Sequence, residues 1–251
     1  MKILAALTGL IFAPSAFAIV NIENLRMDEQ KVGWSTSTTL SVKGKRGNTD
    51  EDDYGLDGGI QWIDKEHQRG DLLLFSATQS QANQQTYSEA YFVHLRHTEH
   101  LTERWAWELF LQHESDPLTD DRLRNLAGTN LRYRLTAIPF NGHAGFGLLQ
   151  EQRSVEPTGQ DKVERETTRF NLYLNSSHQL TETTDWKISL YAQPKTDNWD
   201  DVRAIASTGI SVKINSTFAL TLDLSYSHDS EPLVAQKEYD LSYKSGFNIK
   251  F

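Results

Sequence analysis

The sequence predicts an all-β protein: a transmembrane antiparallel up-and-down β-barrel of about twelve strands, with short periplasmic turns and both termini periplasmic. Three observations lead to this prediction. The C-terminal segment alternates apolar and polar residues as far as an aromatic last residue, Phe251, and the N-terminal segment has the pattern of a secretory signal. Between them no apolar run has the length of a membrane-spanning helix, and the mean hydropathy is -0.55. A chain of this kind can span a membrane only by closing a barrel that hides its polar faces.

The first residues predict export. Lys2 precedes an apolar stretch at residues 3–13, and Ala16-Phe17-Ala18 is a small-x-small cleavage site. We therefore expect residues 1–18 to be a signal peptide, residues 19–31 a short periplasmic lead, and residues 32–251 the barrel. A lead that partly plugs the lumen is the alternative. The chain has no Cys, so it forms neither disulfides nor thiol-metal sites.

Alternation and turn residues divide the rest of the chain into twelve expected strands. They cover approximately residues 32–45, 53–63, 71–81, 86–97, 104–114, 122–135, 142–153, 165–176, 185–193, 201–214, 218–227 and 238–251. Outward faces are clear in most of them, such as Trp105/Trp107/Leu109/Leu111 in the fifth. The third is the least regular, because Leu72-Leu73-Leu74-Phe75 does not alternate.

An even strand number with periplasmic termini assigns each turn to one side of the membrane. Expected extracellular connections are 46–52, 80–85, 115–121, 154–164, 194–200 and 228–237, and expected periplasmic ones are 64–70, 98–103, 136–141, 177–184 and 215–217. Aromatic residues fall at both strand ends: Trp34, Trp62, Trp105, Trp107 and Trp186 on the periplasmic side, and Tyr54, Tyr87, Tyr226 and Tyr239 opposite. A bilayer favours two such belts, whereas a soluble periplasmic sandwich, the alternative fold, has no need of them. The predicted location is the outer membrane of a Gram-negative cell.

The C-terminal strand also carries a candidate targeting motif. Lys244-x-Gly246-x-x-Ile249-x-Phe251 resembles the signal by which the barrel assembly machinery recognises its substrates. The expected partners are that machinery, outer-membrane lipid and lipopolysaccharide. No cofactor is expected.

Several segments resemble a known family. They are residues 20–26, the hairpin tip at residues 46–50, residues 124–135 and residues 142–147. These patterns resemble the YdiY-like family of salt-induced outer membrane proteins, a barrel family with a domain of unknown function. The resemblance covers most of the chain from about Val20 to Phe251, and it implies an outer-membrane location, one barrel domain and no assigned chemistry.

Charge separates between lumen and loops. Inward positions collect basic residues: Lys43, Arg96, Arg122, Arg124, Arg132, Arg134, Arg153, Arg165, Arg169, Lys187, Arg203, Lys213 and Lys244. Fewer carboxylates share these faces: Asp57, Glu108, Glu114, Glu151, Asp223, Glu238 and Asp240. The sequence thus predicts a net basic lumen in a chain whose net charge is -9, because the loops are acidic and include Asp201 and Asp229.

The sequence is compatible with two interpretations of the lumen. Hairpin pairing would bring Glu114 near Arg122, and Glu151 near Arg124 or Asn125, which favours charge neutralisation and a filled interior. A narrow gated pore is the alternative. The acidic loops are either solubilising or weak ligands for divalent cations between lipopolysaccharide phosphates.

Catalytic and metal patterns are weak. His228-Asp229-Ser230 has the residue types of an outer-membrane hydrolase, but neighbouring strand residues point to opposite faces. His94, His97, His100 and His113 fit no tetrahedral spacing, and a sequence pI near 5.4 disfavours nucleic acid. We therefore expect a non-enzymatic barrel, an envelope or stress-related structural protein or a narrow pore for small solutes. The alternatives are a lipid-modifying hydrolase and a surface binding protein acting through its acidic loops.

Overall fold

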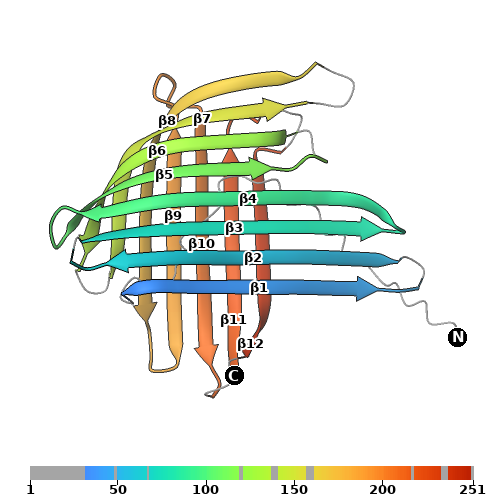
Figure 1. The fold of residues 1–251 in the computed structure, drawn as a ribbon, viewed down its shortest axis with the longest axis horizontal. Coiled ribbons are helices and arrows are strands. Elements are labelled where there is room, and N and C mark those ends of the chain that lie inside the picture. Colours follow the sequence, from blue (N-terminus) through green and yellow to red (C-terminus); the bar gives the residue numbers. More distant parts are fainter. Residues whose placement is uncertain are drawn as a thin grey trace, which may run out of the picture.

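The computed structural model describes residues 32–47, 50–66, 68–118, 121–136, 141–156, 161–215, 218–232 and 237–249. These residues form one antiparallel sheet of twelve strands whose order in space is their order in the chain (Figure 1). The predicted signal peptide, the periplasmic lead and Phe251 lie outside the described residues. Among the described residues, no helix is long and apolar enough to cross a bilayer.

Every expected strand is present, with ends shifted by a few residues. The strands are β1 (Gly33–Lys45), β2 (Glu51–Asp64), β3 (Arg69–Ala82), β4 (Gln85–His100), β5 (Trp105–Ser115), β6 (Asp121–Leu135), β7 (Gly142–Val155), β8 (Val163–Gln179), β9 (Thr184–Pro194), β10 (Val202–Lys213), β11 (Phe218–Asp229) and β12 (Tyr239–Ile249). The irregular strand β3 is apolar on both faces. Leu72 and Leu74 are buried against Phe92, while Leu73 and Phe75 take the opposite face.

The sheet rolls up but does not close. In Figure 1, β1–β4 run across the view, β5–β8 bend over the top, and β9–β12 run down behind them. β1 pairs with β2 and β12 with β11, and no pairing joins β1 to β12 among the described residues. The up-and-down antiparallel order of the prediction is confirmed, whereas its closed wall is not present.

Two rims bound the sheet. We call the end with connections 65–68, 101–104, 136–141, 180–183 and 214–217 the short-turn rim, and the end with connections 46–50, 83–84, 116–120, 156–162, 195–201 and 230–238 the loop rim. Aromatic pairs link neighbouring strands near both. Trp105 and Tyr133 have ring centroids 4.8 Å apart near the short-turn rim, and Tyr226 and Tyr239 are 6.3 Å apart near the loop rim. These pairs occupy the opposite strand ends that the sequence predicts.

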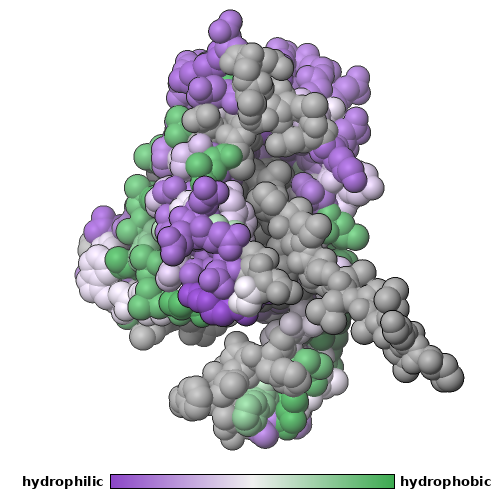
Figure 2. Space-filling view, turned by 90° about the vertical axis from the view of Figure 1, so that its right-hand side faces the viewer, coloured by the Kyte–Doolittle hydropathy of each residue, from purple (hydrophilic) through white to green (hydrophobic). Residues whose placement is uncertain are grey.

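The two faces of the sheet differ in chemistry. In β5, Leu109 and Leu111 are 45% and 52% exposed, whereas Glu108 is fully buried on the other face. The predicted outward set in β5 is confirmed, and Leu220, Leu222 and Leu224 repeat the pattern in β11. Figure 2 shows hydrophobic residues on the flanks of the molecule and a hydrophilic group at its top. The period of two thus leaves the outer face apolar, whereas the inner face carries polar side chains together with buried apolar ones such as Phe110, Leu126 and Leu149.

Candidate functional site: the charged interior and its cavity

The interior of the rolled sheet contains two groups of bonded polar side chains. The first, which we call the Glu151 cluster, consists of Glu114, Arg124, Glu151, Arg153, Arg169, Asp201, Arg203 and Asp229. The second, the Glu108 cluster, consists of Arg96, Glu108, Asn130, Arg132 and Tyr173. Their charged side chains come from inward positions on β4 to β8, on β10 and β11, and from the end of the 195–201 connection.

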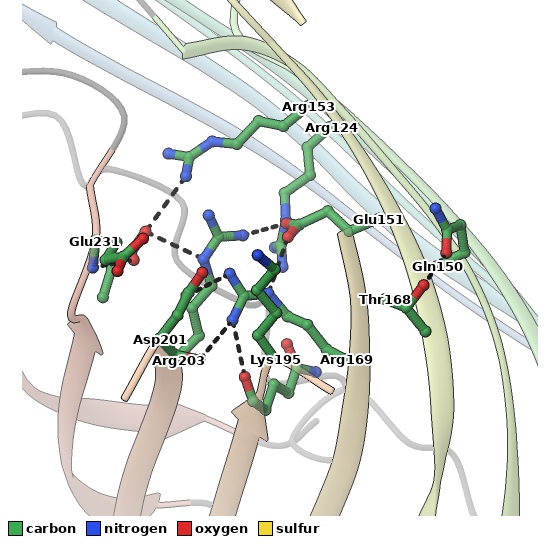
Figure 3. A network of polar contacts seen from close by, with 12 residues as sticks. Arg124, Gln150, Glu151, Arg153, Thr168, Arg169, Lys195, Asp201, Arg203 and Glu231 are labelled. Atoms are coloured by element: carbon green, nitrogen blue, oxygen red, sulfur yellow. Dashed lines mark hydrogen bonds and ion pairs between the residues drawn. The ribbon is translucent and has the colours of Figure 1, made fainter. Parts of the chain in front are cut away.

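Glu151 on β7 holds three guanidinium groups (Figure 3). Its Oε1 accepts a hydrogen bond from Arg124 Nε at 2.6 Å and a second from Arg203 Nη1. Its Oε2 accepts one from Arg169 Nε at 3.2 Å. Glu151 and Arg169 are each only 2% exposed. Because these side chains are buried, both carboxylate oxygens act as fixed acceptors within the protein.

Two aspartates complete this cluster from the far side of the interior. Asp201 Oδ1 accepts from Arg169 Nη2 at 2.7 Å, and Asp229 Oδ2 accepts from Arg203 Nε at 3.1 Å and Arg153 Nη1 at 3.3 Å. The Arg153–Asp229 pair joins β7 to β11 across 76 positions of sequence. The cluster therefore crosses the interior rather than following one hairpin.

The Glu108 cluster lies nearer the short-turn rim. Glu108 Oε1 is 3.5 Å from Arg96 Nη1 and 3.3 Å from Arg132 Nη1, and its Oε2 accepts from Tyr173 Oη at 2.7 Å. Tyr173 reaches across from β8 because Gly145 leaves room on β7. A Cβ at Gly145 would come 2.1 Å from Tyr173 Cε1. The glycine thus permits a bond between two strands that are not neighbours.

Amide side chains connect the two clusters. Gln193 Nε2 donates to Asn171 Oδ1 at 2.9 Å, and Asn171 Nδ2 donates to Asn130 Oδ1 at 3.0 Å. Asn130 Nδ2 then lies 3.5 Å from Glu108 Oε2. At the end of this chain of bonds that meets the Glu151 cluster, Arg169 Nη1 donates to the backbone carbonyl of Gln193 at 3.1 Å. One polar network therefore extends through the interior from β4 to β11.

Most predicted lumen residues lie in this network. Arg124, Arg132, Arg153, Arg169, Arg203, Glu108, Glu114 and Glu151 are all buried. Glu151 contacts Arg124 as expected. Glu114 instead faces Arg124 in the β5–β6 register, and Arg124 Nη1 lies 3.3 Å from its Oε1. The expected Glu114–Arg122 pairing is wrong, because the register of this hairpin is shifted by two residues.

The other predicted lumen residues lie elsewhere. Arg134 is exposed and lines the cavity described below. Asp240 is exposed on the edge strand β12 and joins neither cluster, because among the described residues β12 is hydrogen-bonded to β11 alone. Gly246 and Ile249 of the assembly motif fall within β12. The side chains of Arg122 and Lys244 lie outside the described part of the structure, as does Phe251.

Sequence reasoning missed Asp201 and Asp229, which it assigned to the acidic loops. Asp201 shares the face of Arg203 two residues later, and Asp229 faces Arg203 in the β10–β11 register. The signal that could have found Asp201 is the alternation of the strand, because a residue two positions from an inward arginine lies on the same face. Six arginines are buried among the described residues, against the five carboxylates Glu108, Glu114, Asp116, Glu151 and Asp201. The partly buried Asp229 brings the charges close to balance.

A cavity of about 1040 Å³ opens at the short-turn rim, on the same concave side as the network. Arg96 and Arg132 of the Glu108 cluster form part of its lining, together with residues of the rim connections. Arg134 and Lys187 line it as well. Basic side chains therefore outnumber acidic ones in the lining of this cavity.

The weak catalytic and metal patterns do not assemble in the described structure. Asp229 binds two arginines, whereas Ser230 Oγ donates to the Asp200 carbonyl at 2.9 Å and accepts from Val202 N at 2.8 Å. His94 lies inside, with Nδ1 2.9 Å from Gln112 Oε1, whereas His97 contacts Asp71 on the outer face. No group of three or more potential metal ligands occurs in the ranges that the structure describes.

At the loop rim, several acidic side chains are paired locally. Arg46 Nη2 lies 2.8 Å from Asp52 Oδ1, and this hydrogen bond raises the pKa of Arg46 above its ordinary value. Lys162 Nζ lies 2.6 Å from Glu164 Oε1. These neighbours neutralise part of the negative charge of the connections, which weakens the argument for a divalent-cation site there.

An up-and-down antiparallel sheet with an apolar outer face and an ion-paired interior defines an all-β protein of the barrel type. The chain belongs to the family described as "Protein of unknown function, DUF481", whose model matches residues 38–251. No curated protein matches the sequence.

Solved structures with a similar course of the chain include a porin and two autotransporter domains. The NanC porin matches with 10% identity and a TM-score of 0.46, over 85% of this chain and 100% of the porin. The translocator domain of the autotransporter NalP from Neisseria meningitidis matches with 12% identity and a TM-score of 0.40, over 89% and 90%. The β domain of the Bordetella autotransporter BrkA matches with 11% identity and a TM-score of 0.33, over 87% and 98%.

Proposed function

We propose that the protein is a non-enzymatic integral β-barrel of the Gram-negative outer membrane whose bore is blocked by the Glu151 and Glu108 clusters. Its role is structural, in the envelope. The observation that carries the proposal is the bonding of Glu151 to Arg124, Arg169 and Arg203 across the interior. The resemblance to the YdiY-like salt-induced family supports a role under envelope stress, and the signal-peptide pattern supports export.

The outer face supports insertion in a membrane. From Phe218 to Tyr226 in β11, eight residue steps of roughly 3.3 Å span about 26 Å, with Leu220, Leu222 and Leu224 exposed between them. The apolar band of outer-membrane barrels is about 25 Å tall. Such a surface is unfavourable in water and favourable against lipid.

The interior supports a blocked bore. A barrel of twelve strands lies between the filled eight-stranded barrels and the open porins, so its side chains decide whether it conducts. Here the charged side chains bond to each other across the space, and the pairs leave little excess charge in the loop-rim half. Opening a path would separate buried charges from their partners, which is strongly unfavourable.

Conductance in planar bilayers tests the proposal. We expect the purified wild-type protein to show no steady open level. Glu151→Ala leaves three guanidiniums that repel one another, so we expect frequent openings with anion preference. Glu166→Ala, on the outward face of β8, is the matched control and should behave as wild type. A large, steady wild-type conductance would contradict the blocked bore.

A narrow pore is the second candidate, and the basic cavity at the short-turn rim favours it. In that case the wild-type protein conducts small ions and prefers anions, because charges of one sign in a low-dielectric cleft concentrate counter-ions. The same recording separates the two candidates, since only the pore gives a wild-type open level.

A further inference from the structure

The cavity at the short-turn rim is separate from the bonded network that blocks the bore. It is bounded by strands from β2 to β9 and by the connections 65–68 and 101–104. Its volume of about 1040 Å³ reaches the upper end of the range for small-molecule sites. Because it lies on the concave face, opposite the exposed apolar side chains, a polar ligand can reach it from water.

The lining of this cavity is strongly basic. Seven lysine and arginine residues line it, against three aspartate and glutamate residues. Of these carboxylates, Asp64 lies 3.6 Å from Arg69, and Asp71 accepts from His97 on the outer face. Two of the cations are engaged as well, because Arg69 also lies over the Trp62 ring and Arg104 Nη1 donates to Tyr133 Oη. The other five, Lys65, Arg96, Arg132, Arg134 and Lys187, still outnumber Glu103. Positive charge therefore dominates the space, and a concave wall of low dielectric concentrates its field.

Two of the cations are held in fixed positions. Arg96 and Arg132 are 6% and 3% exposed, and both guanidiniums contact the same oxygen of Glu108. Glu108 is itself held by Tyr173 Oη at 2.7 Å. Two guanidiniums thus share one carboxylate where the network meets the cavity. Fixed guanidinium groups of this kind suit oxyanions, which accept their forked hydrogen bonds.

The remaining walls combine mobile cations with neutral hydrogen-bonding groups. Arg134 and Lys187 are exposed on β6 and β9. Asn175 and Ser189 are buried neighbours in the β8–β9 register and line the same space. Amide and hydroxyl groups beside cations match a ligand that carries hydroxyls as well as negative charge.

We propose that this cavity binds a small hydroxylated oxyanion of the sugar phosphate class, which enters from the short-turn rim. The anionic group meets Arg96 and Arg132, with Arg134 and Lys187 beside the entrance, and the hydroxyls bond to the amide and hydroxyl side chains. The inference uses the proposed function only for the direction of entry, which is then periplasmic.

Titration calorimetry on the folded full-length protein in neutral detergent tests the site. The probes are glucose 6-phosphate, inorganic phosphate and, as the uncharged comparison, glucose. We expect glucose 6-phosphate to bind, phosphate to compete with it, and glucose to give no measurable heat. Affinity should fall as salt is raised, because exposed charges are screened.

Matched double variants locate the site. Arg134→Gln with Lys187→Gln should weaken glucose 6-phosphate binding at least about tenfold, the typical effect of losing one charge-assisted hydrogen bond. Lys162→Gln with Arg165→Gln removes the same charge near the loop rim and should leave affinity unchanged. These four side chains are exposed, so the variants should fold.

Three results would overturn the site: no measurable binding of glucose 6-phosphate, equal weakening by both double variants, or binding of glucose as tight as that of its phosphate. The measurement does not depend on membrane location or conductance. A wild-type protein that conducts and still binds glucose 6-phosphate therefore refutes the blocked bore and leaves the site intact. A wild-type protein that neither conducts nor binds glucose 6-phosphate refutes the site and leaves the blocked bore intact.

Discussion

Glu151 shows how one residue can hold a polar interior together. Its two oxygens bond to guanidiniums from β6, β8 and β10, so a single carboxylate ties together strands that share no hairpin. Buried ion pairs add little net stability when complete, but removing one partner leaves uncompensated charge in a dry environment. The three arginines then repel one another at close range.

We expect Glu151→Gln to destabilise the folded protein by about 3–5 kcal/mol, the usual cost of breaking a buried ion pair. The measurement is urea unfolding followed by the loss of the heat-modifiable band and by tryptophan fluorescence. Glu166→Gln, at an exposed position on β8, is the control and should shift the midpoint little. Equal midpoints for wild type and Glu151→Gln would show that the network is not needed for stability.

At the scale of elements, the edge strands β1 and β12 decide whether the sheet can be stable in a lipid bilayer. Both are exposed along most of their length, and each has one hydrogen-bonded neighbour in the described structure. An open edge in hydrocarbon leaves backbone N–H and C=O groups without partners, at several kcal/mol for each group. The two edges are therefore expected to pair with each other in the membrane.

Cysteine pairs test this closure, and the chain has no native Cys to interfere. Ser41→Cys is combined, in three separate proteins, with Asp240→Cys, Ser242→Cys or Lys244→Cys, which share the inward parity. We expect one combination to oxidise to an intramolecular disulfide in outer-membrane fractions, visible as a faster gel band that reductant abolishes. Pairing of a β1 edge with another copy would instead give a covalent dimer, and no cross-link in any combination would contradict closure.

For the whole molecule, the two rims should face opposite compartments. The short-turn rim carries the pairs Trp34–Trp62 and Trp105–Tyr133, and the loop rim carries the longest connections. Long loops on the outside and short turns on the periplasmic side are usual in outer-membrane barrels. The cavity then opens toward the periplasm.

Single cysteines should reveal this orientation. We expect cysteine at Asn48, Thr119, Gly159 or Asp197 to react with an impermeant maleimide on intact cells, because these positions belong to loop-rim connections. Cysteine at Gln68 or Thr183 should react only after the outer membrane is permeabilised. Labelling of the second set on intact cells, with protection of the first, would invert the barrel.

The sequence by itself determined the strands, their order and their faces. The period of two that separates Trp105, Trp107, Leu109 and Leu111 from Glu108 is a local property, and it survives in the structure as an apolar and a polar face. The register between strands was harder to predict from the sequence, because the pairing of Glu114 with Arg124 depends on the turn at residues 116–120. Alternation alone leaves a hairpin free to shift by two residues without changing either face.

Only the tertiary structure decided which charges meet and where charge remains. Arg153 and Asp229 are 76 positions apart, and they touch because the sheet curls until β7 lies across from β11. Curvature accumulates over many strands and leaves no signature in one segment of sequence. For the same reason the sequence did not reveal that Asp201 and Asp229 pair with inward arginines, or that the cavity at the short-turn rim is lined by more basic than acidic residues.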